Sequence, residues 1–333
     1  MACTKLDQEA IDRSFALEAY IAGSPCLFDL IAVEPDAATH GRLAAWKGSV
    51  SLRDSNALRL TFAHSYCDAL GALAALRCLL TGRPINREQS PELGCDRTRP
   101  PSRRAVTRMH RPPTRLMPSQ RDGDMVTALF DLKPSMGMTG TVTEACVIAC
   151  HKAAQARAPQ SHACSTVLVS VSGDPWGKAR SARNCSSGFL STFTAKGGDV
   201  RRQVVMEMTL ARGSRVALLK RIERYGRIPR PFWPAMRFLS GLSRGGSDVT
   251  AIVSSLGRIN DPVLDSAASA WYFVPPTRHP NSLSFGLMEI GGRVTAGVRG
   301  RGTTASVATA AQEVLKLAEL NPMMSCVLSE GAS

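Results

Sequence analysis

A chain of 333 residues, 44% of them hydrophobic, is long enough to fold into about two well-packed domains. No run approaches the roughly 20 apolar residues of a membrane span. The first residues carry acids and lack the apolar core of a secretory signal, so we expect a cytoplasmic protein.

The first third of the chain predicts strands followed by one buried helix. Residues 28–35 (FDLIAVEP) and 57–63 (ALRLTFA) have the composition of strands. Residues 69–82 (ALGALAALRCLLTG) predict a helix whose only charge is Arg77, so we expect it to be buried on nearly all sides. Gly82 ends it.

The positive charge of the chain, +14 in total, is concentrated after this helix. Residues 83–121 hold ten arginines, three acids and seven prolines, a net charge of 10 − 3 = +7. The prolines predict an extended, solvated linker. The alternative is a positive collar for an anionic partner, such as a phosphate-bearing co-substrate or an acidic protein.

Strands and helices alternate after the linker, which predicts an α/β class. Thr141 or Thr143 can cap the first helix, VTEACVIACHKAAQARA. The remaining predicted elements are strands at 165–173 and at 249–255 (stopped by Gly257), helices at 200–226 (which Gly213 can break), 231–242 and 304–320, and a hairpin turning at Gly291-Gly292.

The ten cysteines never form a CxxC pair. Cys146 and Cys150 lie one helical turn apart beside His151, which raises the possibility of a metal site. Two thiols and one imidazole have no fourth ligand in this pattern. We therefore expect no metal, and reduced, mostly buried thiols in an ordinary amphipathic helix.

Residues 63–70 (AHSYCDAL) combine a histidine at the end of a strand with an aspartate at the start of the buried helix. His64 would be placed at the sheet edge, where an imidazole can act as a general base near neutral pH. Asp68 can cap the first N–H groups of the helix. The alternative is that His64 is only a satisfied turn residue and Asp68 only a cap.

The stretch AHSYCDALGA resembles the HxxxD motif of acyltransferases with the chloramphenicol acetyltransferase-like fold. That superfamily includes the condensation domains of peptide synthetases, the plant BAHD enzymes, and bacterial alcohol and polyketide-associated acyltransferases. Four later stretches are similar to the same family in the same order, so that the likeness covers roughly residues 55–320. They are GTVTEACVIACHKAAQA, STVLVSVSGDP, VTAIVSSLGRI (similar to the family's SNLG strand and turn) and NSLSFGLMEIGGRVTAGV.

The resemblance implies an α/β fold (an α+β sandwich) of two chloramphenicol acetyltransferase-like subdomains with the site at their interface. The implied co-substrate is an acyl thioester of coenzyme A or of a carrier-protein phosphopantetheine arm, with no permanently bound cofactor. His64 would take the proton of an alcohol or amine acceptor, and Asp68 would shape the loop by pairing with an arginine. Ser254 or Ser255, with Gly257, would line the site and stabilise the oxyanion.

The chain also departs from the family pattern. Ala63 stands where the family often has a second histidine, Ala69 follows Asp68 in place of glycine, and Ser255 replaces the asparagine of SNLG. The DFGWG motif of the plant branch is absent, and only 63 residues precede His64, which implies a shortened N-terminal half. The predicted organisation is an N-terminal subdomain (1–96), a linker (97–124) and a C-terminal subdomain (125–333).

Three functions follow from these observations. The first is an HxxxD acyltransferase, and the second is a catalytically inactive relative that binds a carrier protein or a partner enzyme. The third is a basic protein associated with nucleic acid, although no aromatic platform accompanies the arginines.

Overall fold

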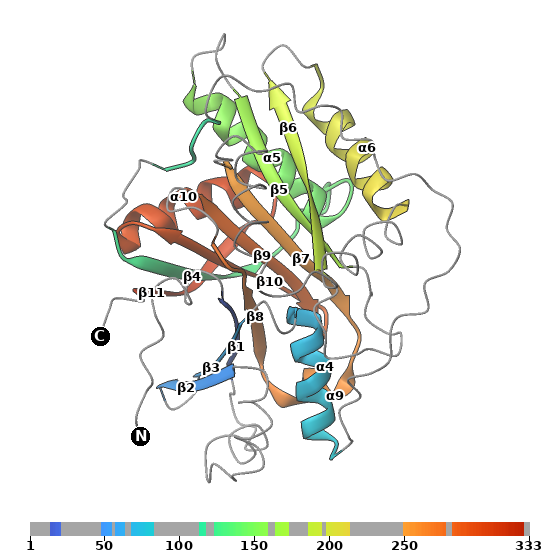
Figure 1. The fold of residues 1–333 in the computed structure, drawn as a ribbon, viewed down its shortest axis with the longest axis vertical. Coiled ribbons are helices and arrows are strands. Elements are labelled where there is room, and N and C mark those ends of the chain that lie inside the picture. The colour runs from blue at the N-terminus through green and yellow to red at the C-terminus, as the bar shows by residue number, and fades with distance from the viewer. Residues whose placement is uncertain are drawn as a thin grey trace, which may run out of the picture.

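In the computed structural model, the described residues form two β-sheets with helices packed around them (Figure 1). The predicted strand at 28–35 and the predicted helix at 231–242 lie outside the described residues. The described residues are 14–20, 48–54, 57–63, 68–82, 113–117, 123–158, 164–172, 186–194, 198–213, 249–277 and 282–329.

The smaller sheet has four strands among the described residues, and every neighbouring pair is antiparallel. In spatial order they are β2 (Gly48–Asp54), β3 (Ala57–Ala63), β1 (Ser14–Tyr20) and β8 (Ala270–Val274). The predicted strand at 57–63 is confirmed as β3. β8 comes from a distant part of the sequence and pairs with β1, with Val274 opposite Ala16.

The larger sheet has seven strands among the described residues and is mixed: β5, β7 and β9 are parallel neighbours, and the other pairs are antiparallel. The predicted α/β class is thereby confirmed, as is the hairpin at Gly291-Gly292, where both glycines have positive φ. In spatial order the strands are β11 (Pro322–Ser329), β4 (Met125–Leu132), β10 (Arg293–Arg301), β9 (Leu283–Ile290), β7 (Ala251–Ile259), β5 (Cys164–Ser172) and β6 (Ser186–Thr194).

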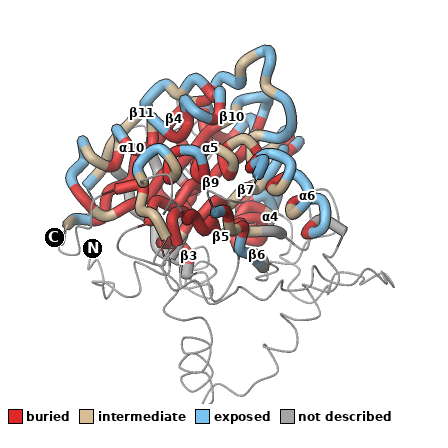
Figure 2. The backbone as a smooth tube through the Cα atoms, turned by 90° about the horizontal axis from the view of Figure 1, so that it is seen from above, coloured by how far each residue is buried: buried red, intermediate tan, exposed pale blue. Residues whose placement is uncertain are grey.

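Two helices, α5 (Val142–Arg157) and α10 (Thr304–Leu317), pack on one face of the larger sheet and enclose its core. Figure 2 shows this region as the largest continuous buried part of the molecule. The predicted cap of the first helix is confirmed at Thr141. Its hydroxyl accepts the Glu144 N–H, and the Glu144 carboxylate accepts the Thr141 N–H in return.

The helix predicted at 200–226 is α6 (Val200–Gly213) in the described residues, and the rest of that prediction lies outside them. α6 packs against α5 and β6. The Gln203 side-chain amide donates a hydrogen bond to the Thr192 carbonyl of β6 at 2.7 Å, which fastens the helix to that strand.

One part of the predicted solvated linker is packed into the protein. Leu116 and Met117 belong to the core of the larger sheet, and the Thr114 N–H donates to the Cys164 carbonyl at 2.7 Å. The prediction of a solvated linker is therefore wrong for these residues, because two apolar side chains hold this turn of chain against the core. The subdomain boundaries at 96 and 124 stay a prediction.

β8 crosses the face of the larger sheet that is opposite α5 and α10, and so joins the two sheets. Gly286 of β9 and Gly297 of β10 are cross-strand partners, and a Cβ on either would overlap the Phe273 carbonyl oxygen of β8. Further along the crossing, the Thr295 hydroxyl donates to the Trp271 carbonyl at 2.6 Å. Because these two paired glycines have no side chains, the backbone of β8 can lie directly against the larger sheet.

His151 lies fully buried between α5 and the β5–β6 pair. Its Nδ1 is 2.7 Å from the Ser165 hydroxyl and its Nε2 is 3.1 Å from the Ser191 hydroxyl. Each ring nitrogen therefore forms a hydrogen bond with a serine hydroxyl. The neighbouring Cys146 and Cys150 thiols are buried, and burial raises the pKa of Cys150. In the described part of the chain, no three potential metal ligands come together.

Acid should destabilise the protein through His151. Burial lowers the pKa of His151 to about 4 in the folded state, against about 6.5 when unfolded. The unfolded chain therefore takes up a proton first, so this stability is complete above pH 6.5 and is lost as the pH falls towards 4. The expected loss between pH 7 and pH 5 is about 2 kcal/mol.

Denaturant unfolding at the two pH values measures this loss. The matched variant is His151→Gln, which cannot titrate, and it should be less stable at pH 7 but should lose less stability on acidification. An equal pH dependence in the variant and in wild type would contradict the assignment to His151.

Candidate functional site

The HxxxD segment spans the junction between β3 and α4 (Ala69–Leu80). His64 lies outside the described residues, but the residues on both sides are described: Ala63 ends β3, and Asp68 precedes α4. The predicted cap is confirmed, because the Asp68 Oδ1 accepts the Gly71 N–H at 2.7 Å. Asp68 is itself buried. Its ion pair with an arginine, implied by the resemblance, stays a prediction.

Replacing Asp68 with alanine should lower the free energy of unfolding by about 1 kcal/mol, because the cap is lost. Asp68→Asn retains a capping oxygen and should stay within about 0.5 kcal/mol of wild type. Chemical denaturation of both variants measures the two effects. A cost of about 3–5 kcal/mol for the asparagine variant would contradict a purely capping role and would establish a buried ion pair.

The helix α4 is buried along most of its length, as its composition predicts. Its core residues pack with β1, β3 and residues that follow β7, so the N-terminal strands and the later chain share one core. The Arg77 Nε pairs with the Asp261 carboxylate at 2.7 Å. Asp261 also accepts the Leu264 N–H as the N-cap of α9 (Pro262–Ala267). One carboxylate therefore links the two helices.

The SSLG segment is a bulge within a strand rather than the end of one. The prediction that Gly257 stops the strand is wrong: β7 continues to Ile259. The register with β9 shifts between Ser255 and Gly257, and Gly257 has a φ of +72°. A glycine adopts this conformation at little cost, so the chain forms a bulge and resumes pairing. The Ser255 hydroxyl oxygen accepts the Gly257 N–H at 3.2 Å.

The structure brings the SSLG segment to the same region as the start of α4. Leu256 packs against the apolar cluster that contains Ala69 and Leu70 of α4. Ser254 is the cross-strand partner of Gly286, so its side chain is on the face that β8 crosses. Two segments that are far apart in the sequence are therefore joined by one core at the meeting of the two sheets.

A buried arginine on this same face has no counterpart in the sequence-based site. Arg299 of β10 is only 1% exposed, and its cross-strand partners are Thr127 of β4 and Ser284 of β9. Ser284 is fully buried, and its hydroxyl has no hydrogen-bond partner among the described residues. The alternation in RVTAGVRG does predict a polar face for this strand, but a polar face is ordinarily solvated. Arg299 lies on the face of the larger sheet that β8 crosses at Gly297, two residues away along β10.

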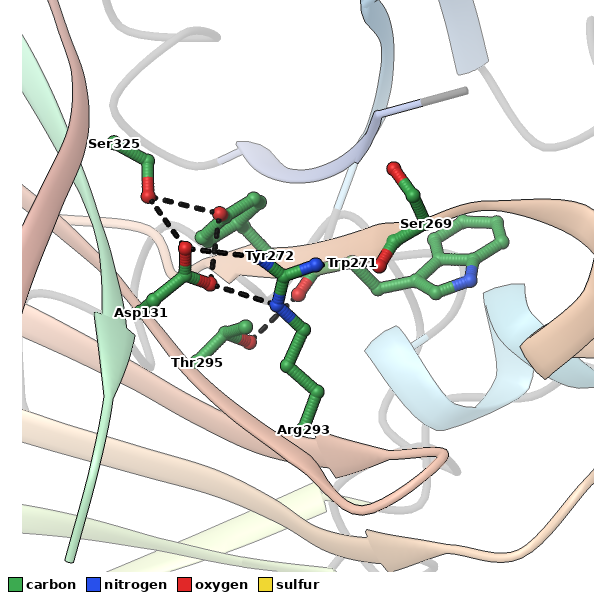
Figure 3. Close-up of polar contacts among 7 residues, drawn as sticks. All are labelled: Asp131, Ser269, Trp271, Tyr272, Arg293, Thr295 and Ser325. Carbon is green, nitrogen blue, oxygen red and sulfur yellow. Dashed lines mark hydrogen bonds and ion pairs between the residues drawn. The ribbon is translucent and has the colours of Figure 1, made fainter. Parts of the chain in front are cut away.

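A polar cluster ties β8 to the rim of the larger sheet (Figure 3). The Asp131 carboxylate receives two hydrogen bonds from Arg293, each 3.0 Å, and one from the Tyr272 hydroxyl at 3.1 Å. The Arg293 guanidinium also donates to the Ser269 carbonyl, and the Ser325 hydroxyl donates to Asp131 at 3.0 Å. The cluster therefore connects β4, β8, β10 and β11.

This cluster stabilises the fold and is not a candidate for catalysis. Burial is the main cause that raises the pKa of Tyr272 to about 12, so the phenol remains a neutral donor. The hydrogen bond to Asp131 raises the pKa of Arg293 above its usual range. Neither group can act as a base near pH 7. The role of the cluster is to hold β8 against the rim of the larger sheet.

The described helices include none that is long and apolar enough to cross a membrane.

No protein-family model and no curated protein matches the sequence, whereas solved structures resemble the fold. The trichothecene 15-O-acetyltransferase TRI3 from Fusarium sporotrichioides is 10% identical, with a TM-score of 0.53 over 95% of this chain and 94% of that chain. The first condensation domain of the calcium-dependent antibiotic synthetase, with a bound substrate analogue, is 12% identical, with a TM-score of 0.51 over 94% and 92%. Another structure, of the first condensation domain of the CDA synthetase, is 12% identical, with a TM-score of 0.50 over 87% and 73%. The predicted chloramphenicol acetyltransferase-like, condensation-domain fold is thus confirmed.

Proposed function

We propose that this chain is an acyltransferase that moves an acyl group from a thioester to a hydroxyl or amine acceptor, with His64 as the general base. One observation carries the proposal: the HxxxD segment spans a strand-to-helix junction whose aspartate caps the helix, in a fold shared with an O-acetyltransferase and with condensation domains. The donor is a thioester of coenzyme A or of a carrier-protein phosphopantetheine arm. No metal or permanently bound cofactor takes part.

The proposed reaction requires one proton transfer in each direction. His64, neutral at pH 7 in ordinary surroundings, takes the acceptor's proton as its oxygen or nitrogen bonds to the thioester carbonyl carbon. The tetrahedral intermediate collapses by breaking the C–S bond, and the imidazolium returns the proton to the departing thiolate. Ser254 and Ser255 are the candidates for stabilising the oxyanion. The Ser255 oxygen accepts the Gly257 N–H, so its own proton is available to donate.

The arginine-rich stretch supports an anionic donor. A net charge of +7 within residues 83–121 favours the phosphates of coenzyme A or of a pantetheine arm. This attraction should weaken as ionic strength rises, because exposed charges are screened within about 10 Å at 0.1 M salt.

Release of free thiol tests the proposed function. The full-length protein is incubated with acetyl-, malonyl- and longer acyl-CoA, or with acylated carrier protein, together with a panel of small alcohols and amines. Thiol release that depends on an acceptor, with the acylated product identified by mass spectrometry, is the expected result.

Binding of a thioester donor without thiol release would contradict the proposal and would favour the second candidate, a catalytically inactive protein that binds a carrier protein or partner enzyme. The departures from the HxxxD pattern at Ala63 and Ala69 are the observations that keep this candidate in view.

A further inference from the structure

Three buried polar side chains form one row across the larger sheet. Thr127 of β4 and Ser284 of β9 are the cross-strand partners of Arg299 on β10, one on each side of it. Thr127 and Ser284 are 0% exposed and Arg299 is 1% exposed. Arg299 lies two residues beyond Gly297, so the row is on the face of the sheet that β8 crosses. Thr127, Arg299 and Ser284 are here called the buried polar row.

Ser284 is the member of the row that the fold does not use for a hydrogen bond. Its hydroxyl is buried and has no hydrogen-bond partner among the described residues. Burying a hydroxyl in this way opposes folding. Met288 and Ile290 lie on the same face of β9 and pack in the apolar core with α4, so this face does not require polar side chains. A buried polar group that the fold does not use indicates a group kept for a ligand.

The junction between β3 and α4 that carries the HxxxD segment lies at the end of β8. Ala63, the last residue of β3, is opposite Ser14 of β1. Two residues further along β1, Ala16 is opposite Val274, the last residue of β8. The end of β3 is therefore level with the residues that directly follow β8.

The larger sheet brings the buried polar row to this same end of β8. Pro275 directly follows β8, and its Cδ would lie 2.7 Å from a Cβ on Gly286. Gly286 is two residues from Ser284 on the same face of β9, and it is the cross-strand partner of Ser254. Ser284 is thus about 7 Å along the strand from the level of Ser254, a candidate for stabilising the oxyanion. A small substrate can span that distance.

The hydrogen-bond donors of the row fit a carboxylate. A guanidinium presents five N–H groups in a planar fork, so Arg299 can hold a ligand in addition to a partner within the protein. Two parallel N–H···O bonds from a guanidinium match the two oxygens of a carboxylate, and the Ser284 hydroxyl supplies a further donor. Burying a doubly charged phosphate costs more than burying a single charge, and one guanidinium neutralises only one, so a phosphate fits less well.

We propose that Arg299 and Ser284 bind a carboxylate of the substrate and so select substrates that carry one. This inference rests on the proposed function, because it concerns the substrate of that reaction. The carboxylate belongs either to the acceptor, as in a hydroxy acid or an amino acid, or to the acyl group of a dicarboxylic thioester. The two sources share one chemistry, and the two arms of the experiment distinguish them.

Isothermal titration calorimetry on the full-length protein measures binding in both arms. The acceptor arm compares short hydroxy acids and amino acids with their primary amides. The acyl arm compares malonyl-, succinyl- and glutaryl-CoA with neutral acyl-CoA of the same chain lengths. In one arm, the carboxylate should bind about tenfold or more tightly than its neutral match, which is the usual effect of one hydrogen bond to a charged group.

Two variants of the row should remove this preference. Ser284→Ala should weaken carboxylate binding by about tenfold, and its melting temperature should equal or exceed that of wild type, because the hydroxyl has no partner among the described residues. Arg299→Lys keeps the charge but loses the planar fork, and it should weaken binding by a similar factor. Arg293→Lys makes the same substitution on the same face at the other end of β10, so it is the matched control and should keep the preference.

Turnover separates this proposal from the proposed function. If acyl transfer occurs, Ser284→Ala and Arg299→Lys should raise the KM for the carboxylate substrate and leave the rate with its neutral match unchanged. If wild type releases no thiol with any donor, the proposed function fails, while the preference measured by calorimetry still tests the row.

Equal binding of carboxylates and their neutral matches by wild type would overturn the carboxylate proposal, and so would the absence of binding in both arms. Tighter binding of inorganic phosphate than of every carboxylate would also overturn it. A Ser284→Ala variant that melts at a lower temperature and keeps the preference would show that the hydroxyl is structural. If Arg299→Lys does not fold, Ser284→Ala decides alone.

Discussion

Replacing His64 with alanine should lower the rate of acyl transfer by about 10²- to 10⁴-fold, the usual contribution of a general base. The melting temperature should change little, because the flanking elements β3 and α4 are held by their own core contacts. The rate is measured as release of free thiol from the donor, with the acceptor in excess.

Two further measurements distinguish loss of the base from an indirect effect. In wild type, the rate should fall at acidic pH, because a protonated imidazole can no longer take the acceptor's proton. The alanine variant should lose this dependence on pH. His40→Ala, outside both the HxxxD segment and the arginine-rich stretch, is the control and should keep the wild-type rate. Equal turnover by wild type and His64→Ala would remove His64 from the mechanism.

Replacing Gly286 with alanine should lower the free energy of unfolding by about 3 kcal/mol or more. The added Cβ would overlap the Phe273 carbonyl oxygen and would lie 2.7 Å from the Pro275 Cδ. Much of what it meets is backbone, so β8 itself must move. Gly297→Ala should behave alike, since its Cβ would meet the same carbonyl and the Val274 Cγ2 at 2.9 Å.

Gly137→Ala is the matched control, because nothing lies within 4 Å of the added Cβ and its backbone is not in the left-handed region. Chemical denaturation should place this variant within about 0.5 kcal/mol of wild type. The Gly286 variant should also lose acyl-transfer activity, because β8 fixes the smaller sheet relative to the larger one. Wild-type stability in Gly286→Ala would show that β8 does not rest on this strand.

Sequence reasoning succeeds where the determining contacts are local. The predicted strand at 57–63, the helix beginning at Ala69, the cap at Thr141 and the hairpin at Gly291-Gly292 are all present. Each depends on residues within a few positions of one another: alternation, a capping side chain or a pair of glycines. Asp68 belongs to the same class, because its bond to Gly71 spans three residues.

Sequence reasoning fails where the determining contacts join residues that are distant in the sequence. β8 (AWYFV) is a short run of buried residues. It pairs with β1 and crosses Gly286 and Gly297, and β1 in particular lies far from it in the sequence. The bulge at Gly257 likewise depends on the register with β9. The burial of Arg299 could not be predicted, because polar alternation in a strand ordinarily indicates a solvated face.

The late position of β8 has a consequence for how the protein acquires its fold during synthesis. β1 emerges from the ribosome about 250 residues before the strand that completes one side of it. Until then, one edge of β1 lacks its partner and is open to wrong pairing. A fragment comprising only residues 1–96 would keep that open edge permanently, so the two predicted subdomains are not expected to mature as independent units.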